Sequence, residues 1–302
     1  MRNNGIARKI VITIIGTLVI TSLLYSAGVL KHHIREARDT KISFVNEDKI
    51  VDSIRKYLKL HYVKIAINFE ADGRYIDDIE EIVTQWIDKA LMPTGVADEG
   101  DYLKFQIGNY KISYVIEDNK LNNKYTVYIE PEYYTTLKQE EEVNEKINKI
   151  MMLLELDMDT SEVEKVERIY EYIYTNVQYD KVHKNNMYYH LDSTAYAALT
   201  YKNASCQGYS VLASRLLLEA GIDNKIVTGY ATKDDKEEYH AWNLVRLGNK
   251  YYNMDITWDK QLESPKYFLK CNNTFIEHKR DLEYTNEEFM DRYPSADRDF
   301  YP

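Results

Sequence analysis

The segment 240–258 constrains the fold most strongly, because it predicts a β-hairpin with a defined register. Residues 240–247 and 250–258 each alternate large apolar side chains with polar ones, as half-buried strands do. Between them lies Gly248-Asn249, a dipeptide typical of two-residue hairpin turns. Since such a turn determines which residues of the two strands face each other, we expect an antiparallel pair here.

The predicted register brings a histidine and an aspartate together. Counting outward from the turn pairs Trp242 with Asp255 and His240 with Thr257, and strand alternation puts all four side chains on one face. His240 and Asp255 become diagonal neighbours, about 7–8 Å apart at the backbone, within reach of a carboxylate–imidazole hydrogen bond. A slip of one residue would send them to opposite faces.

Cys206 precedes a predicted buried helix. The apolar run 210–220 has helical spacing, and Gly221 is placed to end it as a C′ glycine. The partial positive charge of a helix N-terminus favours a thiolate, and a lowered thiol pKa is what a cysteine nucleophile needs. The order of these residues predicts thiol chemistry in which Asp255 orients His240 and His240 activates Cys206.

Six short pieces follow one another through roughly the last half of the chain: Asn176-Val177-Gln178-Tyr179-Asp180, Ala195-Tyr196-Ala197-Ala198-Leu199, Cys206-Gln207-Gly208-Tyr209, His240-Ala241-Trp242-Asn243, Tyr252-Asn253-Met254-Asp255-Ile256-Thr257-Trp258-Asp259 and Tyr267-Phe268-Leu269. Together, in this order, they resemble the transglutaminase-like superfamily of papain-type folds, in its bacterial, exported branch. The local papain signature Cys-Gly-Ser-Cys-Trp is absent. The resemblance is therefore to the architecture of the superfamily and not to papain proteases.

The resemblance implies a role for each member of the predicted triad. The motif cysteine of the family, here Cys206, is the nucleophile. The motif histidine, here His240, is the general base and acid, and the motif aspartate, here Asp255, orients it. The backbone N–H of Cys206 is implied as an oxyanion-hole donor, and the adjacent Gln207 is a candidate side-chain donor.

Four further residues have alternative interpretations. Trp242 and Trp258 either line the cleft or fill the core beneath the hairpin. Asp180 and Asp259 are interpreted as turn or capping acids and stay outside the triad.

The cysteines and histidines limit the other classes of site. Two cysteines exclude a disulfide-dense scaffold and a Cys-based structural zinc site. A disulfide between Cys206 and Cys271 would silence the enzyme and is the main structural alternative. The spacing of His183, His190 and His278 indicates no convergent metal site. We therefore predict no metal and no organic cofactor.

The N-terminus predicts a membrane anchor. Ile10 to Leu30 is a run of 21 residues without charge, long enough as a helix to span about 30 Å of hydrocarbon. Arg2, Arg8 and Lys9 precede it and indicate an N-terminus inside the cytoplasm and a body outside. A cleaved signal peptide, and hence a secreted protein, is the alternative, although the run is long for one.

The chain of 302 residues is long enough for one large or two modest domains. We predict an α+β protein with an anchor at 1–35, a small α+β module at 41–135 and a transglutaminase-like catalytic domain at 136–302. In that domain a helix bearing Cys206 packs on an antiparallel sheet. The net charge of −10 argues against nucleic-acid binding. No motif in the small module indicates chemistry, so we interpret it as a packing or spacer domain, or else a wall of the substrate cleft.

These features predict thiol-dependent acyl chemistry on a peptide-type amide. Cys206 would form a thioester that either water (protease or amidase) or an amine (transglutaminase) resolves. The triad is common to both outcomes, and the resemblance to exported bacterial members favours hydrolysis. The expected partner is a peptide or protein substrate at the cell envelope, and the sequence does not indicate an oligomeric state. The alternatives are a non-catalytic peptide-binding module and a structural envelope protein.

Overall fold

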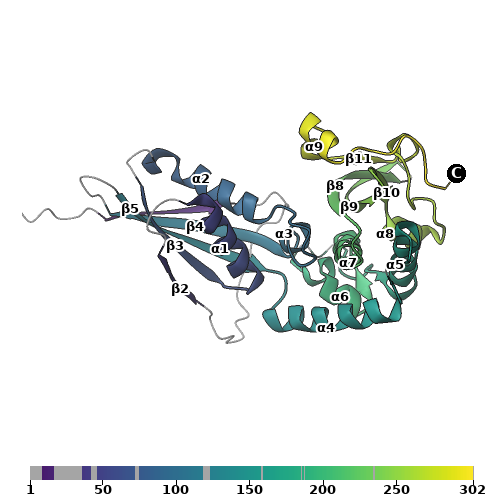
Figure 1. Cartoon of the computed structure of the whole chain (residues 1–302), viewed down its shortest axis with the longest axis horizontal. Helices are drawn as coiled ribbons and strands as arrows, with labels where there is room; N and C mark the ends of the chain where they lie inside the picture. The colour runs from purple at the N-terminus through teal and green to yellow at the C-terminus, as the bar shows by residue number, and fades with distance from the viewer. Residues whose placement is uncertain are drawn as a thin grey trace, which may run out of the picture. The chain divides into compact units, whose positions relative to one another are not determined.

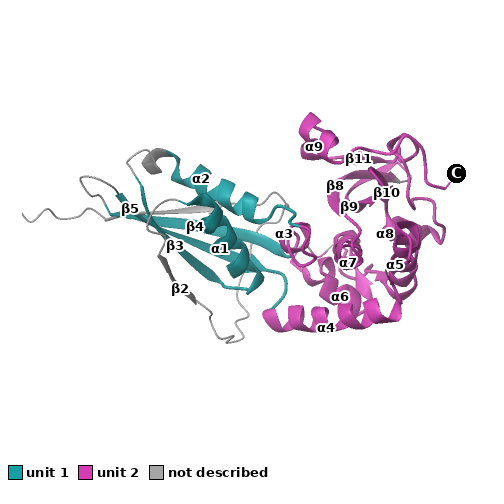
Figure 2. Cartoon of the chain, viewed as in Figure 1, with its two compact units in different colours: residues 1–94, 106–136 teal, residues 95–105, 137–302 magenta. Residues whose placement is uncertain are grey.

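The computed structural model describes residues 9–16, 36–41, 46–71, 75–117, 123–157, 159–184, 186, 188–233 and 235–301. The chain divides into two compact units (Figure 2), of which unit 1 comprises residues 1–94 and 106–136 and unit 2 comprises residues 95–105 and 137–302. The short segment 95–105, expected in the small module, packs with unit 2. Both units contain helices and sheet, in agreement with the predicted α+β class.

Unit 1 is built on a five-stranded sheet with the order β1-β4-β5-β3-β2 (Figure 1). Strands β2 and β3 are parallel, and the other neighbouring strands are antiparallel. The strands are β1 (Lys9–Gly16), β2 (Glu36–Lys41), β3 (Lys64–Ala71), β4 (Ile107–Glu117) and β5 (Asn123–Tyr133), and the helices are α1 (Glu47–Lys59) and α2 (Tyr75–Ala90). Buried and partly exposed side chains alternate along β3, as expected for a strand with one face on the core.

The predicted anchor falls mostly outside the described residues. Residues 9–16 form strand β1, which pairs with β4, whereas residues 17–35 are not described. Within the described ranges, no helix has both the length and the apolar character needed to cross a membrane. The anchor at 10–30 therefore stays a prediction.

Unit 2 combines helices with a four-stranded antiparallel sheet of order β10-β9-β8-β11. Its sheet strands are β8 (Asn224–Lys233), β9 (Lys236–Leu247), β10 (Lys250–Met254) and β11 (His278–Arg280), and a parallel pair consists of β6 (Gln178–Tyr179) and β7 (Asn203–Ala204). The α-helices are α3 (Asp101–Lys104), α4 (Leu137–Leu153), α5 (Glu162–Asn176), α6 (Ala195–Thr200), α7 (Cys206–Glu219), α8 (Ile256–Leu262) and α9 (Glu287–Arg292). Short 3₁₀ turns lie at Leu191–Ser193, Asn272–Thr274 and Leu282–Tyr284.

The hairpin register expected from Gly248-Asn249 is confirmed. Lys250 pairs with Leu247 next to the turn, and Met254 pairs with Asn243 at the other end of the ladder. The expected second strand is nevertheless too long, because β10 ends at Met254.

Residues assigned to the end of that strand form helix α8 instead. The cause is Asp255, whose side chain accepts a hydrogen bond from the backbone N–H of Trp258 at 3.0 Å and so caps the helix. The predicted cross-strand pairs of Trp242 with Asp255 and of His240 with Thr257 therefore do not form. Asp255 still follows the hairpin directly, at the point where the chain leaves the sheet.

The two faces of β9 have different neighbours. Asn243 points to helix α7, where its side-chain amide donates to the Ser210 carbonyl at 3.0 Å. Trp242 and Leu244, which point the other way, belong to a buried cluster with Trp258 and several other aromatic residues. The sheet thus separates the helix that carries Cys206 from an aromatic core formed largely by the last fifty residues.

A buried ion pair attaches segment 95–105 to the sheet of unit 2. Asp101 on α3 pairs with the Lys225 ammonium on β8, and its second carboxylate oxygen accepts from the Ile226 backbone N–H at 2.8 Å. Breaking a buried pair of this kind leaves an uncompensated charge, which is costly. The segment is therefore bound to unit 2 by more than apolar contact.

Strand β11 lies against β8 at a glycine. Gly229 pairs with Arg280, and a Cβ at position 229 would lie 2.1 Å from the Lys279 carbonyl oxygen. Only glycine permits this approach without a shift of the backbone. This contact brings the short strand 278–280, with its histidine and arginine, onto the edge of the sheet.

Candidate active site

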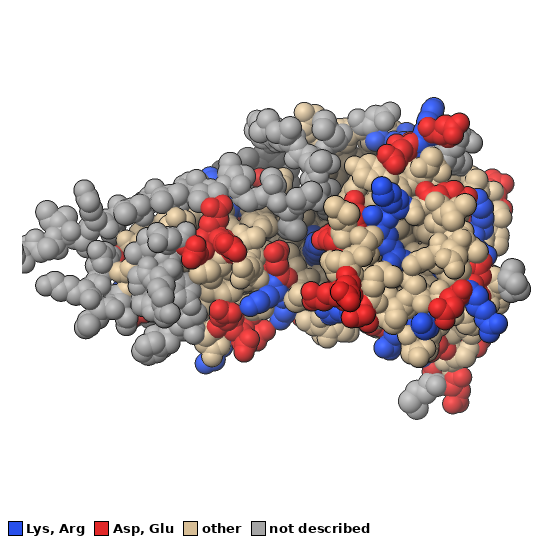
Figure 3. All heavy atoms as spheres, turned by 90° about the horizontal axis from the view of Figure 1, so that it is seen from above, with Lys and Arg blue, Asp and Glu red and all other residues tan. Residues whose placement is uncertain are grey.

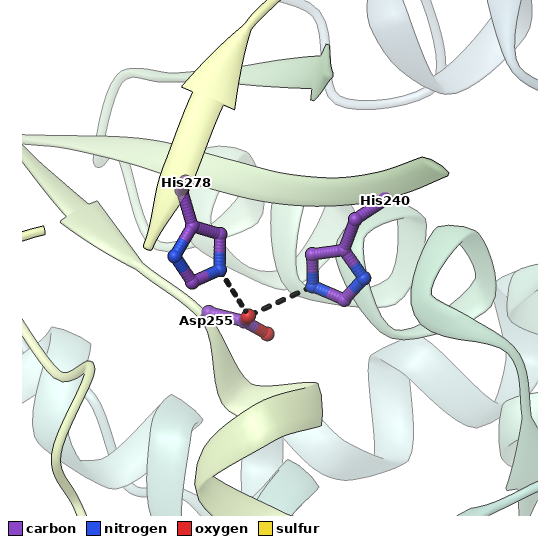
Figure 4. Close-up of side chains that lie close together, drawn as sticks. All are labelled: His240, Asp255 and His278. Atoms are coloured by element: carbon purple, nitrogen blue, oxygen red, sulfur yellow. Dashed lines mark hydrogen bonds and ion pairs between the residues drawn. The ribbon is translucent and has the colours of Figure 1, made fainter. Parts of the chain in front are cut away.

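His240 and Asp255 form a hydrogen-bonded pair inside unit 2. The distance from His240 Nε2 to Asp255 Oδ2 is 2.8 Å, and both residues are buried (Figure 4). His240 comes from strand β9 and Asp255 from the N-terminus of helix α8. The sequence analysis placed these two side chains within hydrogen-bonding reach, and the structure brings them together.

A second histidine, His278, binds the same carboxylate, although its spacing in the sequence indicated no convergent site. His278 Nε2 lies 3.0 Å from Asp255 Oδ2, so that the two imidazoles converge on one oxygen (Figure 4). The His278 side chain is fully buried and stacks on Phe275 with ring centroids 3.9 Å apart. Trp242 and Trp258 also contact its ring. A strand of three residues has no detectable periodicity, so spacing could not identify this contact.

Asp255 is held in its ionised form by these contacts. Burial by itself raises the pKa of the carboxyl group, but His240 and then His278 outweigh it and hold the pKa well below the usual range. The other oxygen, Oδ1, accepts the Trp258 backbone N–H. The carboxylate is therefore charged, and hydrogen bonds orient both of its oxygens.

His240 is poised to hold a proton next to the cysteine. Burial lowers the pKa of its imidazole, but the Asp255 carboxylate and, after it, the Cys206 thiol raise the pKa to about 10. An ionised carboxylate only accepts hydrogen bonds, so Nε2 of His240 carries a proton. The other ring nitrogen, Nδ1, is therefore the one available for the hydrogen bond that His240 makes with Cys206.

His278 differs from His240 in its charge. Burial, which is the largest effect, lowers its pKa despite the opposing influence of Asp255. Its Nδ1 is buried and has no hydrogen-bond partner among the described residues. These observations favour a neutral ring that donates from Nε2 to Asp255.

Cys206 is the first residue of helix α7, as expected, and its side chain is partly exposed. Gly221 follows the helix with φ of +77°, in agreement with the predicted C′ glycine. Cys271 is buried, and both cysteines are free. The disulfide alternative is therefore not realised in this structure.

The residues after Cys206 hold the start of the helix in place. A Cβ at Gly208 would lie 2.4 Å from the Asp192 carbonyl oxygen, so this position allows close backbone approach. The Tyr209 hydroxyl, which is buried, donates to the Val177 carbonyl at 2.7 Å. The Cys-Gln-Gly-Tyr motif is thus explained largely by packing around the N-terminus of α7.

Gln207, the candidate side-chain donor of the oxyanion hole, bonds to the protein backbone in this structure. Its side-chain amide donates to the Phe105 carbonyl at 2.9 Å and to the Ser193 carbonyl at 3.5 Å. Both bonds use the amide nitrogen, so its hydrogens are directed to the protein backbone. The backbone N–H of Cys206 is the remaining candidate from the sequence analysis.

The two tryptophans belong to the core and not to an open cleft. Trp242 and Trp258 are only 1% and 9% exposed. Their rings lie 6.2 and 5.5 Å from the His240 ring, measured between centroids. Of the two interpretations left open for them, core packing beneath the hairpin agrees with this burial.

The two aspartates set aside in the sequence analysis have structural roles. Asp180 accepts from the backbone N–H groups of Val182 and His183, as a turn acid does. Asp259 is fully buried and accepts from the Tyr267 backbone N–H at 2.7 Å and the Tyr170 hydroxyl at 2.9 Å. Burial raises the pKa of Asp259 to about 7.

The three converging side chains also form a possible set of metal ligands. One donor atom each from His240, Asp255 and His278 lies within 4.8 Å of the others. Tetrahedral zinc holds its nitrogen and oxygen ligands roughly 3.3 Å from one another, given metal–ligand bonds of about 2.0–2.1 Å. The contacts of 2.8 and 3.0 Å are shorter and fit shared protons better.

A cavity of about 420 Å³ lies close to the cysteine. Its lining includes Tyr179, Lys181, Lys260 and Glu263. Burial and, after it, the charge of Cys206 raise the pKa of Tyr179, which places this ring near the thiol. No residue of the predicted triad lines the cavity itself.

Part of the chain is similar to known proteins. Residues 153–256 match the family model described as the transglutaminase-like superfamily. A search of curated proteins finds no match. Two solved structures are similar to part of the chain. One is described as "Crystal structure of a TGase" (20% identity, 48% of this chain and 44% of that chain, TM-score 0.36). The other is described as "a Putative Cysteine Protease from Cytophaga hutchinsonii" (19% identity, 48% of this chain and 56% of that chain, TM-score 0.30).

The chain spans about half the length of these two structures. The family match covers the segment from the end of α4 to the first residue of α8. It contains Cys206, His240 and Asp255, in the order on which the sequence resemblance rests. Residues 153–256, which carry all three of these side chains, are therefore similar to the transglutaminase-like superfamily.

Proposed function

We propose that this protein is an extracytoplasmic thiol enzyme that forms a thioester with a peptide-type amide through Cys206, His240 and Asp255. Members of the transglutaminase-like superfamily are usually cysteine proteases or acyltransferases. The observation that carries the proposal is the 2.8 Å bond from His240 Nε2 to Asp255 Oδ2. It leaves Nδ1 of His240 to exchange a proton with Cys206, which begins helix α7.

The proposed reaction has two halves. The thiolate of Cys206 attacks the carbonyl carbon, and the carbon–nitrogen bond breaks as His240 gives its Nδ1 proton to the leaving amine. In the second half, water or an amine attacks the thioester. His240 takes a proton from this nucleophile, and the Cys206 thiolate leaves. Asp255 remains ionised throughout and stabilises the imidazolium.

Several parts of this proposal come from the sequence. The predicted anchor at 10–30 supports a body outside the cytoplasm, or a secreted protein if the segment is cleaved. This location favours a peptide or protein substrate at the cell envelope. The surface charges of the protein fit a peptide substrate better than a nucleic acid, because acidic and basic side chains are interspersed over the described part of one face (Figure 3).

The test is the pH dependence of Cys206 alkylation by iodoacetamide in the full-length chain, with Cys271→Ser as the background. We expect fast labelling well below the ordinary thiol pKa of about 8.5, lost in a His240→Ala variant. The matched control is His183→Ala, because His183 also bonds an aspartate, at 2.7 Å, but lies outside the triad. This control should label like the background protein.

An ordinary thiol titration that is indifferent to His240 would refute the proposal. The non-catalytic peptide-binding module or the structural envelope protein would then be the better interpretation. With an activated thiol established, mass spectrometry of peptide amides incubated with and without a primary amine separates hydrolysis from transamidation. In hydrolysis water replaces the released ammonia on the acyl group and leaves a carboxylic acid, whereas in transamidation the added amine replaces it and leaves a substituted amide.

A further inference from the structure

A second cavity, of about 280 Å³, lies beside the aromatic core of unit 2. Its lining includes Trp242, Phe275 and Met290 as apolar walls, with Asn272, His278 and Arg280 as polar residues. No carboxylate contributes to the lining. The cavity is slightly smaller than the usual ligand site, which has a volume of roughly 300–1,000 Å³, and it has room for a molecule the size of one amino acid.

Arg280 provides a positive charge to this cavity without a negative partner. Its Nη2 donates to the side-chain oxygens of Asn253 at 2.9 Å and Asn272 at 2.8 Å, which are both neutral. Among the described residues Arg280 makes no ion pair, and Nε and Nη1 make no hydrogen bond. Burial lowers its pKa to about 10, so the guanidinium is still charged at neutral pH.

Three acids of this region bond to other groups, and one of them, Asp255, is bonded to His240 and His278. Asp281 accepts from the hydroxyls of Thr228 and Tyr239, both at 2.7 Å. Asp299 accepts from the Cys271 backbone N–H at 2.9 Å and pairs with Lys270. A partly buried cation without a counter-ion costs free energy. The two hydrogen bonds to neutral amides offset only part of that cost, and no described carboxylate pairs with Arg280. An anion from outside the protein would offset the remaining cost.

We propose that this cavity binds the carboxylate of a small apolar or aromatic acid, with the carboxylate on Arg280 and the apolar body between Trp242, Phe275 and Met290. Guanidinium groups match planar carboxylates in geometry and charge. The same chemistry occurs in a free N-acylated amino acid and in the C-terminal residue of a peptide. The site is independent of Cys206, so it stands whether or not the proposed function is correct.

The cavity also has a link to the triad, because His278 lies in its wall and donates to Asp255. The carboxylate of a bound acid would interact with the His278 ring and, through Asp255, with His240. Binding of an acid in this cavity is therefore expected to alter the rate of Cys206 alkylation as a secondary effect. The proposal itself concerns binding and is tested by binding.

The test uses the full-length protein and two probes that differ only in charge, N-acetyl-phenylalanine and N-acetyl-phenylalanine amide. Titration calorimetry is the main readout, and quenching of tryptophan fluorescence is the second, since Trp242 lines the cavity. We expect the acid to bind at least tenfold more tightly than the amide, with a preference that falls as salt is added. Equal affinities, or no binding of either probe at millimolar concentration, would overturn the proposal.

Two variants locate the binding. Arg280→Gln should abolish the preference for the acid, whereas Arg246→Gln, at an exposed arginine on β9, should keep it. If Arg280→Gln does not fold, Met290→Trp leaves the charge in place and fills the cavity, and should reduce binding of the acid at least tenfold. Retention of wild-type binding in the folded Arg280→Gln or in Met290→Trp contradicts the assignment.

A third probe separates the two sources of the carboxylate. The tetrapeptide Ala-Ala-Ala-Phe with a free C-terminus should bind as tightly as N-acetyl-phenylalanine if the site accepts chain ends. If it binds at least tenfold more weakly, the cavity is closed to longer chains and its ligand is a small acid. Both results support the carboxylate site on Arg280.

Discussion

The His278 imidazole lies 3.0 Å from Asp255 Oδ2, the same oxygen that accepts the hydrogen bond of His240. A buried carboxylate thus has two imidazole donors of different charge. His240 carries the higher pKa and faces Cys206, whereas His278 is neutral and enclosed by aromatic rings. We infer that His278 is a positioning residue, which keeps Asp255 ionised and correctly oriented.

Replacing His278 by phenylalanine should slow turnover without weakening substrate binding. The ring would still fill its space between aromatic neighbours, but Asp255 would lose one donor. A hydrogen bond to a charged group is worth about 1.5–3 kcal/mol, so kcat should fall roughly 10- to 100-fold with KM nearly unchanged. The alkylation rate of Cys206 should also become more sensitive to acid. His278→Gln, which restores an N–H donor, should recover part of the rate, and equal effects of both variants would contradict the positioning role.

Replacing Asp255 by asparagine should have a larger effect on the same reaction. The side chain would keep its shape but lose the charge that raises the pKa of His240 to about 10. We expect kcat/KM to fall by roughly 10³- to 10⁴-fold, as for loss of the orienting aspartate in other triads. The pH at which His240 loses its proton should move down toward 6.5, which NMR titration of the ring can follow. An unchanged titration would show that Asp255 does not control His240.

Asp259 is predicted to make stability depend on pH. Burial raises its pKa from 3.8 to about 7, so folding favours the protonated form. This contribution is fully present below pH 3.8 and is lost as the pH rises through about 7. Asp259→Asn should remove it, so that the Tm of the variant relative to wild type increases by several °C between pH 4.5 and 8. Parallel Tm curves for the two proteins would mean that Asp259 titrates normally.

Gly208→Ala should disturb the start of helix α7. The added Cβ would lie 2.4 Å from the Asp192 carbonyl oxygen, which belongs to the backbone and has little room to move. We expect a loss of stability of about 1–3 kcal/mol and slower alkylation of Cys206, because the shift occurs two residues away. Gly221→Ala is the matched control, since no atom lies within 4 Å of the added Cβ and only the positive φ is unfavourable. The Gly221→Ala control should lose stability but keep the alkylation rate of Cys206. If both variants slow alkylation equally, the effect of Gly208→Ala is not a local displacement of the start of α7.

The elements of the candidate site that local patterns encode could be predicted from the sequence. The hairpin register follows from a two-residue turn between two alternating strands, and the position of Cys206 follows from the apolar helix behind it. The length of the second strand could not be predicted in the same way. Asp255 caps α8 through a side-chain bond to Trp258, and a cap of this kind overrides the strand-like alternation of the residues that follow.

Local sequence patterns were sufficient to predict the order of Cys206, His240 and Asp255, the helix and hairpin that carry them, and the resemblance that the family match confirms. The surroundings of these residues depend on contacts between distant segments. Strand β11 pairs with β8, although more than forty residues separate them in the chain, and Gly229 permits the close approach. This pairing places His278 next to Asp255 and Arg280 in the wall of its cavity. Gln207 is likewise directed to the Phe105 carbonyl, about one hundred residues before it. Such contacts depend on which distant segments pack together. The spacing of hydrophobic residues predicts local helices and strands but not the packing of distant segments.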